Sequence, residues 1–337
     1  MLGHLSPHCA VITEVEYQRL TRACDELIGR PDAPQEIAAV PWLHIINEVP
    51  FILSAYSDVL QETVRITARM HQSNPFVSVR NLSQHPAYHF AQFMKGFVRS
   101  FYYRDSRRIG HPGLGAPALP DLGLAKADVV IVTWLVNRNH LDGTHDFYFG
   151  EIQERLKKRG LSTLLLMRNQ SGFHSPELQR KALRKGSCAR FLLPDTQSPR
   201  AEVDYLIQML RLRIYLRTLA AKEPVPYRRR LYLKVSELSV LTPGLQNLRL
   251  HQQVQTVCRK LSPSVVMTLY EGHAWERFVW HGAREANPQT LCIGYQHTIL
   301  RKNSHAMKRG LHPGRKGYDP DVLFALGEIT HRMLENS

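Results

Sequence analysis

Three neighbouring segments decide the fold class: ADVVIVTWLV (127–136), GEIQERLKKRG (150–160) and LSTLLLMRN (161–169). The first and third are short and mainly apolar, which is typical of strands that are buried on both faces of a sheet. The second is polar with helical spacing and stops at a glycine, which predicts a helix between the strands. Together they form a βαβ unit with parallel strands. The sequence therefore predicts an α/β protein with a Rossmann-like parallel sheet.

The same alternation returns later in the chain. SVVMTLYEG (264–272), TLCIGYQH (290–297) and the start of DVLFALGEITHRMLENS (321–337) indicate further strands, and HAWERFVWHGAREAN (273–287) indicates a helix. Two long helices, from Glu202 to Lys222 and from about Leu245 to Lys260, interrupt the alternation. A helical insertion around 200–260 is therefore expected within the sheet domain.

The rest of the chain has a different pattern. Residues 1–103 show apolar side chains at helical spacing without strand signals, and residues 104–126 are rich in Gly and Pro. We therefore predict a helical N-terminal region over 1–103, a linker over 104–126 and a Rossmann-like domain over 127–337.

Composition narrows the class of partner. The 337-residue chain has a net charge of +15, which favours an anionic partner such as nucleic acid, a phospholipid surface or a phosphorylated small molecule. Its five cysteines form no CxxC pair, so neither a disulfide framework nor a structural metal site is predicted. The longest apolar stretches fall far short of the roughly 20 residues of a membrane-spanning helix. The first residues do not resemble a secretion signal, so a cytoplasmic location is expected.

Polar side chains follow two of the predicted strands at the sheet edge where such folds bind ligands. Glu271 and His273 follow one strand, and His297 follows the next. Glu271 and His297 are the candidate catalytic residues, because a carboxylate or an imidazole can take a proton from a hydroxyl. Trp275 and Glu276 begin the next helix, where the alternative roles are packing for Trp275 and complementing the helix dipole for Glu276.

The same residues carry a family resemblance. The run from YEGHAWE (270–276) to GYQH (294–297) resembles the YEG-x-x-WE and GYQH pattern of bacterial surface carbohydrate biosynthesis proteins, which are assigned as glycosyltransferases of O-antigen and capsule clusters. PWLHIINEVPFILSAYSDVL (41–60) and DVVIVTWLVNRNHLDGTHDFYFG (128–150) also resemble segments of that family. The similarity extends over most of the chain from about Trp42.

The resemblance implies a GT-B architecture, in which two Rossmann-like domains face each other across a cleft. The first domain binds a lipid-linked or glycan acceptor, and the second binds a nucleotide sugar, the only co-substrate implied. The resemblance places eight residues at the cleft edge of the first domain: Glu271, His273, Trp275, Glu276, Gln296 and His297, joined by Asp146 and Tyr148. Because the chain stops where the second domain is expected, we expect it to bind nucleotide sugars weakly.

Two other functions stay open from the sequence. Basic and aromatic residues interleave in RLRIYLR (211–217) and YRRRLYLK (227–234), as in proteins that bind single-stranded nucleic acid. No nucleic-acid module is recognisable and the basic residues are spread along the chain, so no nucleic-acid partner is expected. The other alternative is a noncatalytic sugar-binding or assembly protein with the same fold.

The basic stretches also suggest a peripheral contact with the inner face of the plasma membrane. Each cation near an anionic leaflet contributes about 1 kcal/mol, and neighbouring Leu, Ile and Tyr can enter the headgroup region. The alternative is that these side chains are only solvated while the helix packs inward. The predicted contact residues are Arg211, Arg213, Arg217, Arg228, Arg229 and Arg230.

Overall fold

The computed structural model describes residues 13–40, 43, 56, 59, 90–95, 97, 98, 124–136, 140, 145–170, 189–298, 300, 307 and 317–335. The predicted linker over 104–126 lies outside these residues except for 124–126. The predicted helical region over 1–103 is described only in part.

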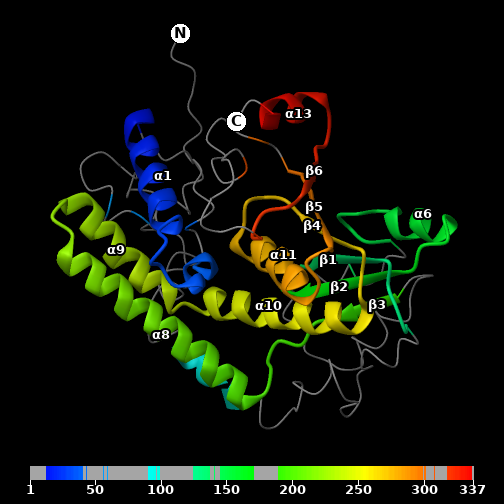
Figure 1. Cartoon of the computed structure of the whole chain (residues 1–337), viewed down its shortest axis with the longest axis horizontal. Helices are drawn as coiled ribbons and strands as arrows, with labels where there is room; N and C mark the ends of the chain where they lie inside the picture. The colour runs from blue at the N-terminus through cyan, green and yellow to red at the C-terminus, as the bar shows by residue number, and fades with distance from the viewer. Residues whose placement is uncertain are drawn as a thin grey trace, which may run out of the picture.

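A six-stranded parallel sheet forms the centre of the described chain (Figure 1). Its strand order is β3-β2-β1-β4-β5-β6, which is an order of Rossmann-like doubly wound sheets. The α/β class and the Rossmann-like sheet are thus confirmed. The strands are β1 (Val129–Leu135), β2 (Thr163–Asn169), β3 (Ala189–Leu192), β4 (Val265–Leu269), β5 (Leu291–Tyr295) and β6 (Val322–Phe324).

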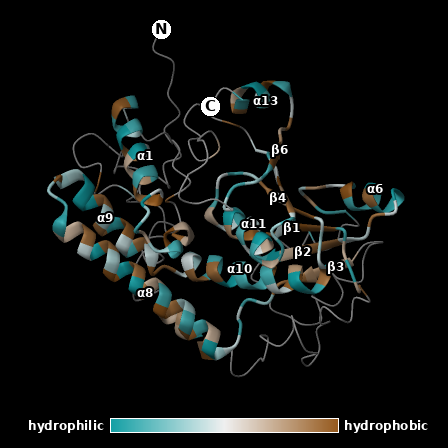
Figure 2. Ribbon diagram, viewed as in Figure 1, coloured by the Kyte–Doolittle hydropathy of each residue, from teal (hydrophilic) through white to brown (hydrophobic). Residues whose placement is uncertain are grey.

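The inner strands owe their place to their apolar side chains. In β1 every residue except Trp134 is buried, and in β2 the first five residues are buried. Figure 2 shows the strands of the sheet largely in the colour of hydrophobic residues. β6 lies at an edge, where Val322 and Phe324 are exposed. β3 was not predicted, because its segment ARFL offers only a short apolar run.

A helix follows each of the strands β1, β4 and β6, at the places where the sequence predicts helices. α6 (Ile152–Lys158) follows β1 and gives way to Gly160, whose φ of 77° suits glycine. α11 (Ala274–Ala286) joins β4 to β5, and α13 (Glu328–Glu335) follows β6. The helices predicted at these places are therefore present.

A second apolar core lies beside the sheet. It is formed by α1 (Glu14–Ile28), the 3-10 helix η1 (Gln35–Ala39), α8 (Pro199–Lys222) and α9 (Pro226–Ser239). Figure 1 shows α8 and α9 side by side, with α1 next to α9. The described N-terminal residues thus share a core with the helical insertion. α9 was not predicted as a helix, because its charged start RRR hides the apolar spacing of the residues after it.

α10 (Thr242–Leu261) connects the two cores. Leu245 and Leu248, near its beginning, belong to the second core, whereas Val254 and Val257 pack on the sheet. A buried ion pair between Arg249 and Glu202 of α8, with an N–O distance of 2.6 Å, fixes where α10 passes α8. None of the helices in the described part of the chain combines the length and apolarity needed to cross a membrane.

Candidate functional site

A pocket of about 460 Å³ lies beyond the carboxyl ends of β1, β2 and β4. β1 and β4 are neighbours in the sheet but not in the chain, so the strand order reverses between them, and Rossmann-like folds bind ligands at such a reversal. The ends of α10 and α11 that face it are N-termini, which favour anionic groups. Its walls are Trp134, Val136, Tyr148, Arg168, Gln170, Pro243, Gln246, Asn247, Glu271, His273, Ala274 and Trp275.

The carboxylate of Glu271 lies in this pocket between two imidazoles. Glu271 Oε2 is 3.2 Å from Nε2 of His273, and Oε1 is 3.3 Å from Nε2 of His297. The Glu271 side chain is 23% exposed, so a ligand in the pocket can reach it. Because β4 pairs with β5, the segments that follow these strands meet, and the sequence-based placement of Glu271 beside His297 agrees with the structure.

The surroundings of Glu271 favour its ionised form. Burial raises the pKa of Glu271, but the hydrogen bond and charge interaction with His273 and the charge interaction with His297 outweigh it, so the pKa is lowered. Burial lowers the pKa of His297 despite the opposing charge of Glu271. At neutral pH the site therefore combines an ionised carboxylate with a neutral His297, and both can accept a proton.

The turn that presents Glu271 is held from behind by Glu276. Gly272 takes a φ of 84°, a conformation that favours glycine, and this reverses the chain between β4 and α11. The Glu276 carboxylate accepts the backbone N–H groups of Glu271 at 3.0 Å, Gly272 at 2.9 Å and His273 at 3.1 Å. Three consecutive backbone donors, one at buried Gly272 and two at half-buried Glu271 and His273, thus share the Glu276 carboxylate as their acceptor.

Glu276 is consequently not a wall of the pocket; the structure shows it holding the backbone of the turn, and direct substrate contact stays a prediction. Its side chain is fully buried, and both oxygens face the backbone of the turn. Burial and the negative charge of Glu271 raise its pKa well above the usual value, against the opposing effect of the backbone hydrogen bonds. The residue acts by positioning Glu271 and His273.

Two further predicted contact residues also serve the backbone. Asp146 is buried and accepts the backbone N–H groups of Tyr148 and Phe149, each at 2.9 Å. Gln296 is fully buried, donates to the carbonyl of Thr298 and accepts the N–H of Leu326 at 2.9 Å. Neither lines the pocket, so the structure shows both residues holding backbone groups, and their predicted substrate contact stays a prediction.

Aromatic rings form much of the remaining wall. Trp134 and Trp275 meet edge to face with ring centroids 4.7 Å apart. Tyr148 lines the pocket and packs against the ring of His297 at 5.1 Å. Trp275 is 3% exposed, so it contributes packing as well as a small part of the wall. The packing interpretation of Trp275 is therefore confirmed, whereas its contact with substrate stays a prediction.

Arg168 is a pocket residue that sequence reasoning missed. It stands near the end of β2, lies over the ring of Trp134 at 4.6 Å and donates to the neutral side chain of Gln246 at 3.1 Å. Burial and the nearby Arg249 lower its pKa, yet an arginine stays charged at neutral pH. Its position at a strand end, the signal used for Glu271, could have identified it. The pocket therefore holds a cation as well as a carboxylate.

The six arginines proposed for membrane contact lie on α8 and α9, outside the pocket walls. Arg228 forms an ion pair with Glu26 at 2.6 Å, and Arg229 donates to the carbonyl of Glu223 at 2.9 Å. Arg211 and Arg217 are exposed on α8, and Arg213 and Arg230 are half-buried. Contact of this surface with an anionic membrane stays a prediction.

Replacement of Glu276 by alanine should lower the free energy of unfolding by about 3–5 kcal/mol, because it leaves the N–H group of buried Gly272 and those of half-buried Glu271 and His273 without their acceptor. Glu276→Gln should cost less, since its remaining carbonyl oxygen can take the place of Oε2. Urea denaturation followed by circular dichroism measures both values. Glu328→Ala, at an exposed first-turn position of α13, is the control and should change the value by less than about 0.5 kcal/mol. A loss in Glu276→Ala as small as the control would contradict this role.

Comparison of the chain with models of known protein families, with curated proteins and with solved structures found no match. The functional interpretation of the pocket therefore depends on its geometry and on the motifs quoted above.

Proposed function

We propose that the chain is a glycosyltransferase of bacterial surface polysaccharide biosynthesis, or its acceptor-side half, and that it corresponds to the first domain of a GT-B architecture. The observation that carries the proposal is the Glu271 carboxylate, held between His273 and His297 in a pocket at the strand-order reversal. The YEG-x-x-WE and GYQH motifs support it, because their residues form or position this group.

The proposed reaction requires one proton acceptor and a place for negative charge. An acceptor hydroxyl attacks the anomeric carbon of an activated sugar, its O–H proton passes to the Glu271 carboxylate, and the bond from that carbon to the nucleotide phosphate breaks. The interaction with His273 lowers the pKa of Glu271, so the carboxylate is ionised and ready for the proton. The leaving phosphate carries negative charge, which the guanidinium of Arg168 can stabilise from the same pocket.

The pocket walls also suit a carbohydrate. Sugar rings have apolar C–H faces and polar hydroxyl edges, so they fit sites that combine aromatic surfaces with a few polar groups. Trp134, Trp275 and Tyr148 supply the aromatic surface, while Glu271 and Gln246 offer hydrogen-bonding groups. A lipid-linked or glycan acceptor is the substrate class that this combination supports.

Glu271→Gln should reduce the turnover of sugar transfer by roughly 100-fold or more, because an amide cannot accept the proton. The assay follows labelled sugar from UDP-, GDP-, TDP- and CMP-sugars onto lipid-linked and soluble glycans. Glu154→Gln is the matched control, since Glu154 also contacts an imidazole, that of His145 at 3.5 Å, outside the pocket. Unchanged turnover in Glu271→Gln would remove the residue from this role. Carbohydrate binding without transfer by the wild type would instead indicate a noncatalytic sugar-binding protein.

The pH dependence of transfer gives a separate test of the two imidazoles. The base works when ionised, so activity should fall as the pH drops through the pKa of Glu271, which lies below its usual value of 4.5. His273→Ala removes a hydrogen bond and a charge that stabilise the carboxylate, so this pKa should rise and the acidic limb of kcat/KM should move to higher pH. His297→Ala should move it in the same direction by less. If the acidic limb of kcat/KM has the same midpoint in His273→Ala as in the wild type, His273 does not lower the pKa of the catalytic base.

A further inference from the structure

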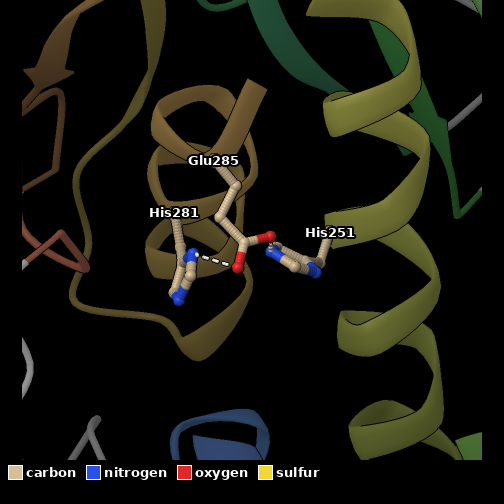
Figure 3. Close-up of side chains that lie close together, drawn as sticks. All are labelled: His251, His281 and Glu285. Atoms are coloured by element: carbon tan, nitrogen blue, oxygen red, sulfur yellow. Dashed lines mark ion pairs between the residues drawn. The ribbon is translucent and has the colours of Figure 1, made fainter. Parts of the chain in front are cut away.

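Three side chains that can bind metal meet between α10 and α11, outside the walls of the pocket. His251 comes from α10, and His281 and Glu285 come from α11, with the carboxylate of Glu285 between the two imidazoles (Figure 3). Nε2 of His251 is 3.0 Å from Oε2 of Glu285, and Nδ1 of His281 is 3.8 Å from Oε1. One ligand atom of each residue lies within 4.8 Å of the others.

The packing of the two helices creates this arrangement. His281 and Glu285 are four residues apart and so lie on the same face of α11. Gly282 lets that face approach α10 closely, since a Cβ atom at this position would be 2.7 Å from the carbonyl oxygen of His251. Gln255, one turn further along α10, donates to Oε2 of Glu285 at 2.9 Å.

We propose that His251, His281 and Glu285 form a binding site for a divalent transition-metal ion, with zinc as the best fit. Two imidazoles and one carboxylate are the three protein ligands of many zinc sites that keep a fourth position open for water or substrate. Magnesium and calcium prefer oxygen ligands, so the two imidazoles select against them. The site differs from the Glu271 pocket and does not depend on the function proposed for that pocket.

The distances fit this interpretation. In a tetrahedral zinc site with bonds of about 2.0–2.1 Å, neighbouring ligand atoms lie about 3.3 Å apart. The contacts made by the two oxygens of Glu285, 3.0 Å from Oε2 to His251 and 3.8 Å from Oε1 to His281, lie on either side of that value. One ligand atom from each of the three residues lies within 4.8 Å of the others, so small side-chain movements would bring them to coordination distance.

The surroundings of the three groups also resemble those of metal ligands. Glu285 is 38% exposed at its side chain, whereas His281 is 13% exposed, so an ion would have a buried side and a side open to solvent. The ring of Tyr318 packs on His281 at 4.0 Å and restrains its orientation.

A bound ion would link the two helices whose N-terminal residues form part of the pocket wall. Pro243 and Gln246 of α10 and Ala274 and Trp275 of α11 line that pocket. Coordination by His251 from one helix and by His281 and Glu285 from the other would therefore hold the two parts of the wall together.

The test is a zinc titration of the full chain, purified without a histidine tag and stripped with a chelator. The wild type should bind one zinc ion with a dissociation constant of about 1 μM or below. His281→Ala and Glu285→Gln should weaken binding by at least about 100-fold, because even the loss of an outer hydrogen-bond partner of a metal ligand costs about 10- to 100-fold. Cobalt should give the visible absorption of a tetrahedral site in the wild type and not in these variants.

Two controls separate this site from others. His331→Ala removes an imidazole that contacts Glu335 at 3.2 Å with the same four-residue spacing, and it should bind zinc like the wild type. Glu271→Gln should also retain zinc binding, since that carboxylate lies between two other imidazoles. If His281→Ala fails to fold by circular dichroism, the nearly isosteric Glu285→Gln decides. Equal zinc affinity in the wild type and Glu285→Gln, or loss of binding in Glu271→Gln, would overturn the proposal.

Discussion

The buried carboxylate of Glu276 determines how the end of β4 becomes a site. Without this acceptor, the N–H group of buried Gly272 and those of half-buried Glu271 and His273 would lose their hydrogen bonds, and the tight turn at Gly272 would lose its support. With the acceptor in place, Glu271 faces the pocket and His273 lies beside it. Glu271, which faces the pocket, and Glu276, which positions it, are therefore five residues apart in the sequence. The first carboxylate is open to the pocket, whereas the second is fully buried.

α10 connects both the sheet and the second core to this site. The beginning of α10 lies in the pocket wall and in the second core, while its later turns pack on the sheet. The contact at Gly282 keeps α11 close to it. α10 thus contacts α8 and η1 and also contributes to the pocket wall. This connection gives the helical insertion a role in shaping the site, because the sheet edge alone supplies only part of the wall.

The sequence predicted the elements whose signals are local. β1, α6 and β2 follow from their apolar spacing and from Gly160, and the meeting of Glu271 with His297 follows from the parallel pairing of their strands. Other features depend on tertiary contacts that no local pattern contains. Glu276 has the same residue type as Glu271, and only burial behind the turn distinguishes their roles. The residues of the proposed metal site come from two helices. The four-residue spacing of His281 and Glu285 could be seen in the sequence, but the approach of His251 from α10 could not.

The central claim is that carbohydrate binds at the strand-order reversal with a hydroxyl on Glu271. A crystal structure of the chain soaked with mono- and disaccharide fragments tests it most directly. The account predicts a sugar ring against the wall formed by Trp134, Trp275 and Tyr148, with one hydroxyl about 2.6–3.2 Å from a Glu271 oxygen. Carbohydrate bound on another surface, with no ring in this pocket at the same fragment concentration, would contradict it.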